Sequence, residues 1–209
     1  MINNVESVVY AVMANCVLIH GGLRDGSVWD PVVQILKEHG HRVFAPSLAK
    51  PQNSTLSGHI SEVCKLIEDE NLRNVFLVGH SYASFVITGV ADKMPERIKR
   101  LIYVDSSVPR NGKSLYGMFE LQGFTSEDYA LPQDPPFLEP LYFDEEKVRK
   151  MPKTYVHCTR SEFIALTKSV FKQVIENAER DNWDYFQIES DQICMISHPD
   201  ELAKILLRD

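Results

Sequence analysis

The chain has 209 residues, a length typical of one domain that buries a sizeable core. Hydrophobic residues make up 44% and charged residues 24%, which is ordinary for a globular protein. The formal net charge of −7 argues against nucleic acid and against an anionic membrane surface as partners, because both require a basic patch. No apolar stretch approaches the roughly 18 residues that a membrane-spanning helix needs.

The ends and the cysteines suggest an ordinary cytoplasmic chain. Residues 1–13 lack the basic start of a signal peptide, and Glu6 interrupts their apolar residues, so we interpret them as an extra strand or an arm. The four cysteines are widely spaced and form no CxxC pair, which indicates neither a zinc site nor a disulfide framework. Cys16 and Cys158 fall in predicted strands, where a cysteine usually acts as a small apolar residue. A reducing cytoplasm is therefore the expected compartment.

Strand-like and helix-like segments alternate along the chain. Short apolar runs that end at turn residues predict strands at 17–20, 42–45, 75–78, 101–104, 154–158 and 185–188. Apolar residues at helical spacing predict helices at 28–39, 56–70 and 85–94, and a last helix that begins at Pro199. Short, fully apolar strands between helices indicate a mostly parallel sheet with helices on both faces. The predicted organisation is a single α/β domain over residues 1–209.

Residues 109–152 break this alternation. The segment is too long for a plain connection, and it is rich in aromatic residues such as Tyr116, Phe119 and Phe137. It follows the tip of a predicted strand, where ligands bind in open α/β sheets. We predict a small cap over a binding site, and the alternative is a surface excursion packed by its own aromatic side chains.

The motif Gly79-His-Ser-Tyr-Ala83 joins an apolar strand directly to a helix. It matches G-x-S-x-G, with alanine in the last place. A sharp strand-to-helix turn requires small residues two before and two after the serine, and it exposes the serine hydroxyl at the head of the helix. The helix N-terminus also favours negative charge nearby. This context makes Ser81 the candidate nucleophile, against the alternative of a chance match in a connecting loop.

Several motifs in the same order make the chain resemble the α/β-hydrolase superfamily, and within it the small bacterial esterase-like members related to plant hydroxynitrile lyases and methylesterases. The resemblance covers nearly the whole chain after residue 15. The segments that carry it are Val17–Gly22, Gly79–Ala83, Val90–Ile98, Leu101–Pro109 and His198–Ala203. It implies an α/β-hydrolase fold with a short cap.

The resemblance also implies an oxyanion hole, in which two backbone N–H groups stabilise the charge that develops on a carbonyl oxygen. One is the N–H of Tyr82, directly after the serine, and the other is assigned to Gly22. His20 is expected to order its loop. The side chain of His80 is expected to point away from Ser81.

A serine nucleophile needs a base, and the base needs an orienting acid. In the family, the acid ends either the strand after the elbow helix or the next strand. The first place holds Asp105, about one strand spacing of ~4.8 Å from the elbow. The second place holds Ser161, where many members have aspartate, followed by Glu162. We favour Asp105 as the acid, with a turn-capping role as its alternative.

The base is absent from its expected position. The family places it about seven residues before the proline of the final helix, and here that residue is Gln192. Glutamine forms hydrogen bonds but does not accept the serine proton near neutral pH. Three explanations stay open: His198 replaces the base, the protein is a pseudoenzyme, or Gln192 is an engineered replacement of histidine. His157 lies in a predicted buried strand and is a weak candidate, and the histidines interpreted as surface residues are His39, His41 and His59.

The sequence thus predicts hydrolysis of a small ester by acyl transfer to Ser81, without a cofactor. No metal is expected, because the His, Asp and Glu residues lack ligand spacing. The competing prediction is an impaired variant or pseudoenzyme that binds a small ligand in the same pocket; nothing selects a hydroxynitrile lyase. The expected partner is a small molecule, and the sequence does not indicate an oligomeric state. Residue 192 should lie within hydrogen-bond reach of both Ser81 and Asp105.

Overall fold

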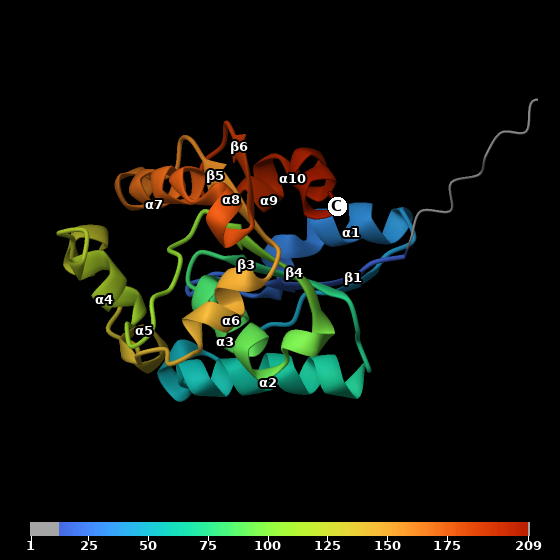
Figure 1. Cartoon of the computed structure of the whole chain (residues 1–209), viewed down its shortest axis with the longest axis horizontal. Coiled ribbons are helices and arrows are strands. Elements are labelled where there is room, and N and C mark those ends of the chain that lie inside the picture. The colour runs from blue at the N-terminus through green and yellow to red at the C-terminus, as the bar shows by residue number, and fades with distance from the viewer. Residues whose placement is uncertain (1–12, 209) are drawn as a thin grey trace, which may run out of the picture.

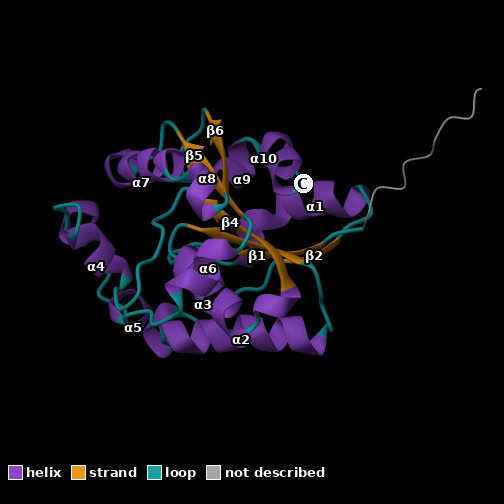
Figure 2. Cartoon of the chain, viewed as in Figure 1, coloured by secondary structure: helices purple, strands orange, loops and turns teal. Residues whose placement is uncertain are grey.

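The computed structural model describes residues 13–208, which form a sheet of six parallel strands between layers of helices (Figures 1 and 2). The strand order is β2-β1-β3-β4-β5-β6, and every neighbouring pair is parallel. The strands are β1 (Asn15–Ile19), β2 (Arg42–Phe44), β3 (Val75–His80), β4 (Ile98–Val104), β5 (Lys153–Cys158) and β6 (Trp183–Ile188). The predicted α/β fold is confirmed. The predicted strand or arm at the N-terminus lies outside the described residues, apart from Met13.

Helices cover both faces of the sheet, with α1 packed against α10 and α2 packed against α3 (Figure 2). The longer helices are α1 (Asp30–Glu38), α2 (Leu56–Asp69), α3 (Ala83–Lys93), α7 (Ile164–Glu176) and α10 (Pro199–Leu206). The shorter ones are α4 (Leu115–Glu120), α5 (Pro135–Leu138), α6 (Glu145–Lys150), α8 (Ala178–Asp181) and α9 (Cys194–Ser197). None of the helices found within residues 13–208 combines the length and the apolar character needed to cross a membrane.

The apolar strands bury both of their faces. Val17 and Ile19 of β1 join the core cluster beneath α2 and α3, whereas Cys16 and Leu18 join the cluster beneath α1 and α10. Alternate residues of a strand point to opposite faces, so a strand covered on both sides must be apolar throughout. Cys16 and Cys158 are fully buried in β1 and β5, as predicted.

Most element boundaries differ from the predicted ones by one to three residues, and two of these differences have a clear structural cause. Helix α3 begins at Ala83, two residues early, because the chain enters the helix directly from the turn at Ser81. Strand β6 begins at Trp183 instead of residue 185, because Trp183 pairs with Lys153 of β5. Such pairing depends on the neighbouring strand, so it cannot be recognised from the local sequence periodicity.

Residues 109–152 carry α4, α5 and α6, with α4 and α5 at the left of Figure 1. The aromatic side chains of this segment pack on one another and on the central domain. The Phe137 ring lies 4.9 Å from that of Tyr82 and 6.0 Å from that of Tyr116, measured between centroids. The segment is therefore anchored beside the residue that follows Ser81.

Candidate active site

Ser81 occupies a sharp turn between β3 and α3. Its φ angle is +52°, a left-handed conformation that few non-glycine residues adopt. Its backbone N–H donates to the carbonyl of Val104 at 3.0 Å, which continues the β3–β4 ladder into the turn. A Cβ atom on Gly79 would lie 2.7 Å from the carbonyl oxygen of Ala83, so only glycine fits there. The small residues of the motif thus allow the turn that presents Ser81.

Substitution Gly79→Ala should lower the free energy of unfolding by about 1–3 kcal/mol, the usual cost of overpacking a tight site. The clash is with backbone, which has little room to move. Urea unfolding monitored by circular dichroism measures the change. Gly117→Ala is the matched control, because its added Cβ would first meet the flexible Ser114 hydroxyl at 3.3 Å. Equal stability of the two variants would contradict the packing argument.

Two backbone donors lie beside Ser81. A Cβ on Gly21 would lie 3.3 Å from the Ser81 Cβ, and a Cβ on Gly22 would overlap the Phe137 ring at 2.6 Å, so this loop approaches the turn closely. Within residues 13–208, the N–H groups of Gly22 and Tyr82 have no hydrogen-bond acceptor. Both residues line the same pocket as Ser81. Unpaired donors of this kind are what an oxyanion hole requires.

His20 orders the glycine loop, as predicted. Its Nε2 accepts a hydrogen bond from the Leu48 N–H at 3.0 Å, so Nδ1 carries the proton and donates to the carbonyl of Gly21 at 2.8 Å. Burial lowers the pKa of His20. A neutral ring with this tautomer holds the loop that carries Gly22.

The interpretation of His59 as a surface residue is wrong. Its side chain is buried; Nε2 donates to the carbonyl of Ala49 at 2.9 Å, and Nδ1 accepts from the Tyr82 hydroxyl at 2.9 Å. Residue 59 follows Leu56 by three and precedes Val63 by four, which places it on the buried face of α2. That spacing was the signal in the sequence that could have found it.

Gln192 lies next to Ser81. It belongs to the loop between β6 and α9, is 8% exposed, and its Nε2 donates to Ser81 Oγ at 3.4 Å. The residue counted back from Pro199 therefore does reach the serine. The group next to Ser81 Oγ is thus an amide N–H, which donates a hydrogen bond and does not accept a proton near neutral pH.

Asp105 ends β4 in a second left-handed turn, with a φ angle of +41°. Its Oδ1 accepts from the Cys158 N–H at 3.3 Å, whereas Oδ2 is buried without a hydrogen-bond partner. Burial raises the pKa of Asp105 to about 6, and the nearby Ser161 hydroxyl opposes the rise. No hydrogen bond joins Asp105 to Gln192 in the part of the chain that the structure describes. Of the two expected contacts of residue 192, the structure shows the one to Ser81.

The remaining histidines do not approach Ser81 as bases. His198 stands between α9 and α10, where its Nδ1 shares a hydrogen bond with the Ser197 hydroxyl at 3.0 Å. His157 is buried in β5, as predicted, and stacks on Phe171 with ring centroids 4.7 Å apart. His198 and His157 are both absent from the lining of the Ser81 pocket.

His80 contributes to the pocket floor, although sequence reasoning gave it no role there. A Cβ on Gly21 would lie 3.0 Å from its Nδ1, so its ring packs closely against that loop. Burial lowers the pKa of His80 to about 4, and the adjacent backbone of Gln192 opposes this only in part. The ring is neutral at physiological pH and supports the loops on either side of Ser81.

The Ser81 pocket has a volume of about 510 Å³, within the usual range for small-molecule sites. Besides Ser81 and Gln192, it is lined by aromatic residues and by three acidic residues near its mouth. The aromatic residues are Tyr82, Tyr116, Phe119, Tyr129, Phe137 and Phe163, and the acidic residues are Glu127, Asp128 and Glu162. Glu162, the alternative acid, thus faces the pocket. Among residues 13–208, no group of three or more His, Cys, Asp or Glu side chains is arranged to hold a metal ion.

The parallel sheet, the left-handed serine between β3 and α3, and the adjacent backbone donors define the α/β-hydrolase class of proteins. The chain belongs to the Alpha/beta hydrolase family, whose family model matches residues 16–204.

Comparison with curated proteins finds several esterases. The carbendazim hydrolyzing esterase of Nocardioides sp. is 41% identical over 114 residues, which cover 51% of this chain and 47% of that protein. Methylesterase 8 of Arabidopsis thaliana is 31% identical over 119 residues, covering 53% and 43%, respectively. The match therefore spans about half the length of these curated relatives.

Solved structures share the fold. An extracellular α/β-hydrolase from a Paenibacillus species has a TM-score of 0.75 and 22% identity, over 94% of this chain and 100% of that one. A pyrethroid hydrolase from Sphingobium faniae also has a TM-score of 0.75, with 18% identity over 93% and 96% of the two chains. At these identities the likeness concerns the fold alone.

Proposed function

We propose that this chain is a carboxylesterase-like serine hydrolase in which Ser81 attacks a small ester. The observation that carries the proposal is the left-handed turn at Ser81, which shares a pocket with the unpaired backbone N–H groups of Gly22 and Tyr82. The esterase and hydrolase names of the curated relatives support it. The aromatic lining of the pocket favours an ester with small apolar groups.

The proposed reaction is acyl transfer. Ser81 Oγ attacks the ester carbonyl carbon, and the resulting oxyanion accepts hydrogen bonds from the N–H groups of Gly22 and Tyr82. Collapse of this intermediate releases the alcohol, which takes up a proton, and leaves an acyl-serine that water hydrolyses. Gln192 cannot take the serine proton, so water must accept it. In a well-studied serine protease, loss of the base lowers kcat on the order of 10⁶ and leaves roughly 10³–10⁴ over water.

A ligand-binding pseudoenzyme is the second candidate, and one observation favours it. The Gln192 amide donates to Ser81 Oγ, which engages a lone pair that a nucleophile needs. The same pocket would then bind a small ester or a similar molecule without turning it over.

A fluorophosphonate probe and a series of p-nitrophenyl esters test the proposal. We expect slow labelling of the Ser81 peptide by mass spectrometry and slow ester turnover, both lost in Ser81→Ala. Ser61→Ala removes an exposed serine and serves as the matched control, with no expected loss. Turnover that survives Ser81→Ala would refute the nucleophile, and binding of an ester without labelling or turnover would establish the pseudoenzyme.

A further inference from the structure

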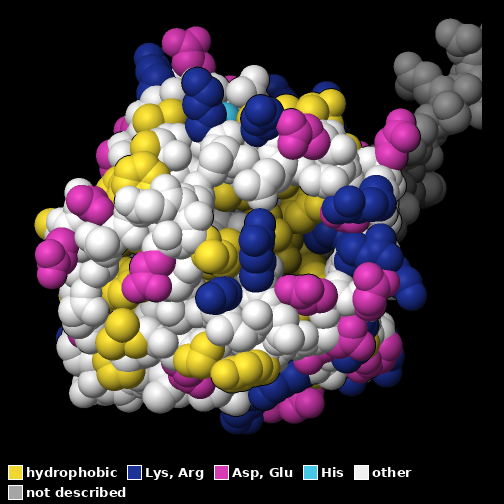
Figure 3. All heavy atoms as spheres, turned by 60° about the vertical axis from the view of Figure 1, so that its left-hand side comes forward, with side chains coloured by type: hydrophobic (Ala, Val, Ile, Leu, Met, Phe, Trp, Pro, Cys, Tyr) yellow, Lys and Arg dark blue, Asp and Glu magenta, His cyan; other side chains and the backbone are white. Residues whose placement is uncertain are grey.

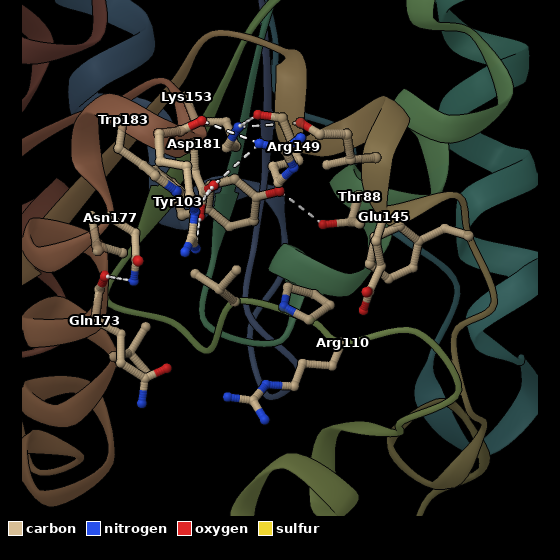
Figure 4. A pocket seen from close by; sticks show the side chains of 17 residues that line it. Thr88, Tyr103, Arg110, Glu145, Arg149, Lys153, Gln173, Asn177, Asp181 and Trp183 are labelled. Carbon is tan, nitrogen blue, oxygen red and sulfur yellow. Dashed lines mark hydrogen bonds and ion pairs between the residues drawn. The ribbon is translucent and has the colours of Figure 1, made fainter.

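A second cavity, of about 490 Å³, opens beside α6 and α7 (Figure 4). It is built from α3 and β4, from the loop after β4, from α6 to α8, and from the starts of β5 and β6. No residue that lines it also lines the Ser81 pocket. Its size alone would admit a small organic molecule.

One wall of this cavity is apolar. The rings of Tyr103 and Trp183 lie 5.2 Å apart at a tilt of 58°, and Val148 and Val170 add aliphatic surface. The hydroxyl of Tyr103 is engaged with Thr88, whose own proton goes to the carbonyl of Ser84. The apolar part of a ligand that packs against this wall would be removed from contact with water, which is favourable.

The charged lining is cationic, although the chain carries a net charge of −7. Two acidic side chains, Glu145 and Asp181, face four cationic ones, which are Arg110, Arg149, Lys153 and Arg180. Asp181 is already neutralised, because Arg180 binds its two carboxylate oxygens at 2.8 Å each and Arg149 approaches at 3.6 Å. Arg149 is itself paired with Glu146, so the remaining charges are those of Arg110 and Lys153 against Glu145, an excess of one positive charge.

Lys153 is a buried cation without a carboxylate partner. Its side chain is 3% exposed, and its Nζ donates to the carbonyls of Val148, Arg149 and Met151 at 3.2, 2.6 and 2.8 Å. Burial lowers its pKa to about 8; the nearby carboxylate of Asp181 opposes this shift, and the like charge of Arg149 adds to it. An anion in the cavity would stabilise this charge, because Coulomb attraction is strong where water is excluded.

The guanidinium of Arg110 is the cationic group available to contact a bound anion. Figure 4 shows the Arg110 side chain at the edge of the cavity, on the side where Gln173 of α7 also lies and opposite Lys153 and Trp183. Its guanidinium makes no hydrogen bond or ion pair with another residue in the range 13–208. In Figure 3, Lys or Arg side chains stand at the mouth of a hollow whose floor is hydrophobic, which matches this combination.

We propose that this cavity binds a small organic carboxylate with an apolar body. The guanidinium of Arg110 holds the carboxylate through two parallel hydrogen bonds, the geometry that arginine prefers. The apolar body lies along Trp183 and Tyr103. The inference does not depend on the chemistry of Ser81, so binding is measured separately from ester turnover.

Titration of the full chain with octanoate, followed by tryptophan fluorescence, tests this site. The chain has two tryptophans; Trp29 is fully buried in the core, and Trp183 lines the cavity. We expect a saturable change at millimolar octanoate or below, which disappears in Trp183→Phe. Octylammonium and octanol, with the same chain length, should bind at least tenfold more weakly.

Two arginine variants test which side chain binds the carboxylate of octanoate. Arg110→Gln, at an exposed position that should not disturb folding, is expected to weaken octanoate binding tenfold or more. Arg24→Gln removes the arginine that lines the Ser81 pocket and should leave octanoate affinity unchanged. Isothermal titration calorimetry repeats both comparisons without an optical probe. No saturable binding, equal affinity for octylammonium, or unchanged affinity in Arg110→Gln would each overturn the proposal.

Discussion

Gln192→His is expected to raise kcat/KM for p-nitrophenyl acetate by about 10²–10⁴, the usual contribution of a positioned general base. The side chain of residue 192 already lies against Ser81 Oγ, so an imidazole at the same position replaces a donor by a proton acceptor. Initial rates at pH 8, with protein quantified by active-site labelling, measure the gain.

Two controls show whether a gain in kcat/KM comes from a general base at residue 192 or from a change in pocket shape. Gln192→Asn keeps an amide but shortens it, and no gain is expected. Ser81→Ala in the Gln192→His background should remove the gain completely. If Gln192→His folds and shows no increase, residue 192 is not the base position, and the count from Pro199 has misaligned the last loop.

The Gln192→His variant also tests whether Asp105 is the acid that orients the base. The Oδ2 of Asp105 is buried and partnerless, a costly state that an imidazole N–H would relieve. Asp105→Asn in the Gln192→His background should therefore lose most of the gain, since an amide cannot stabilise the imidazolium. Glu162→Gln is the matched comparison, because Glu162 lines the pocket. A larger loss in Glu162→Gln would transfer the proposed role to that residue.

In the unaltered chain, Asp105→Asn is expected to stabilise the fold at alkaline pH. Burial raises the folded-state pKa of Asp105 to about 6, against roughly 3.9 in an unfolded chain. The native state then binds the proton more tightly, so this group favours folding below pH ~4 and loses that contribution as pH rises through 6. A shift of about two units corresponds to roughly 3 kcal/mol.

Urea unfolding at pH 4, 6 and 8 measures this linkage. The variant should gain up to about 3 kcal/mol over the unaltered chain at pH 8 and little at pH 4. An asparagine keeps an oxygen for the Cys158 N–H, replaces the partnerless Oδ2 by an amide NH2 and removes the charge. Glu120→Gln, at an exposed position, should show no such pH-dependent difference. Parallel pH profiles for Asp105→Asn and the unaltered chain would show that the Asp105 carboxyl is not destabilised by burial.

Features that arise from local pattern could be predicted from the amino-acid sequence. Apolar runs between turn residues predicted the strands, because a strand buried on both faces has to be apolar at every position. The small residues around Ser81 predicted the turn, because backbone contacts there exclude a Cβ at Gly79. The resemblance to the α/β-hydrolase superfamily, through the count back from Pro199, implied that residue 192 lies near the serine, and Gln192 does contact Ser81.

Contacts between residues far apart in the sequence could not be predicted and became visible in the folded chain. Asp105 lies against Cys158, and His59 is held by Ala49 and Tyr82, contacts made across elements that the chain brings together from far apart. The Arg110 cavity likewise combines side chains from seven helices and strands and from the loops between them. The physical reason is that periodicity and turn chemistry act over a few residues. Side-chain burial and charge pairing depend instead on which elements pack together.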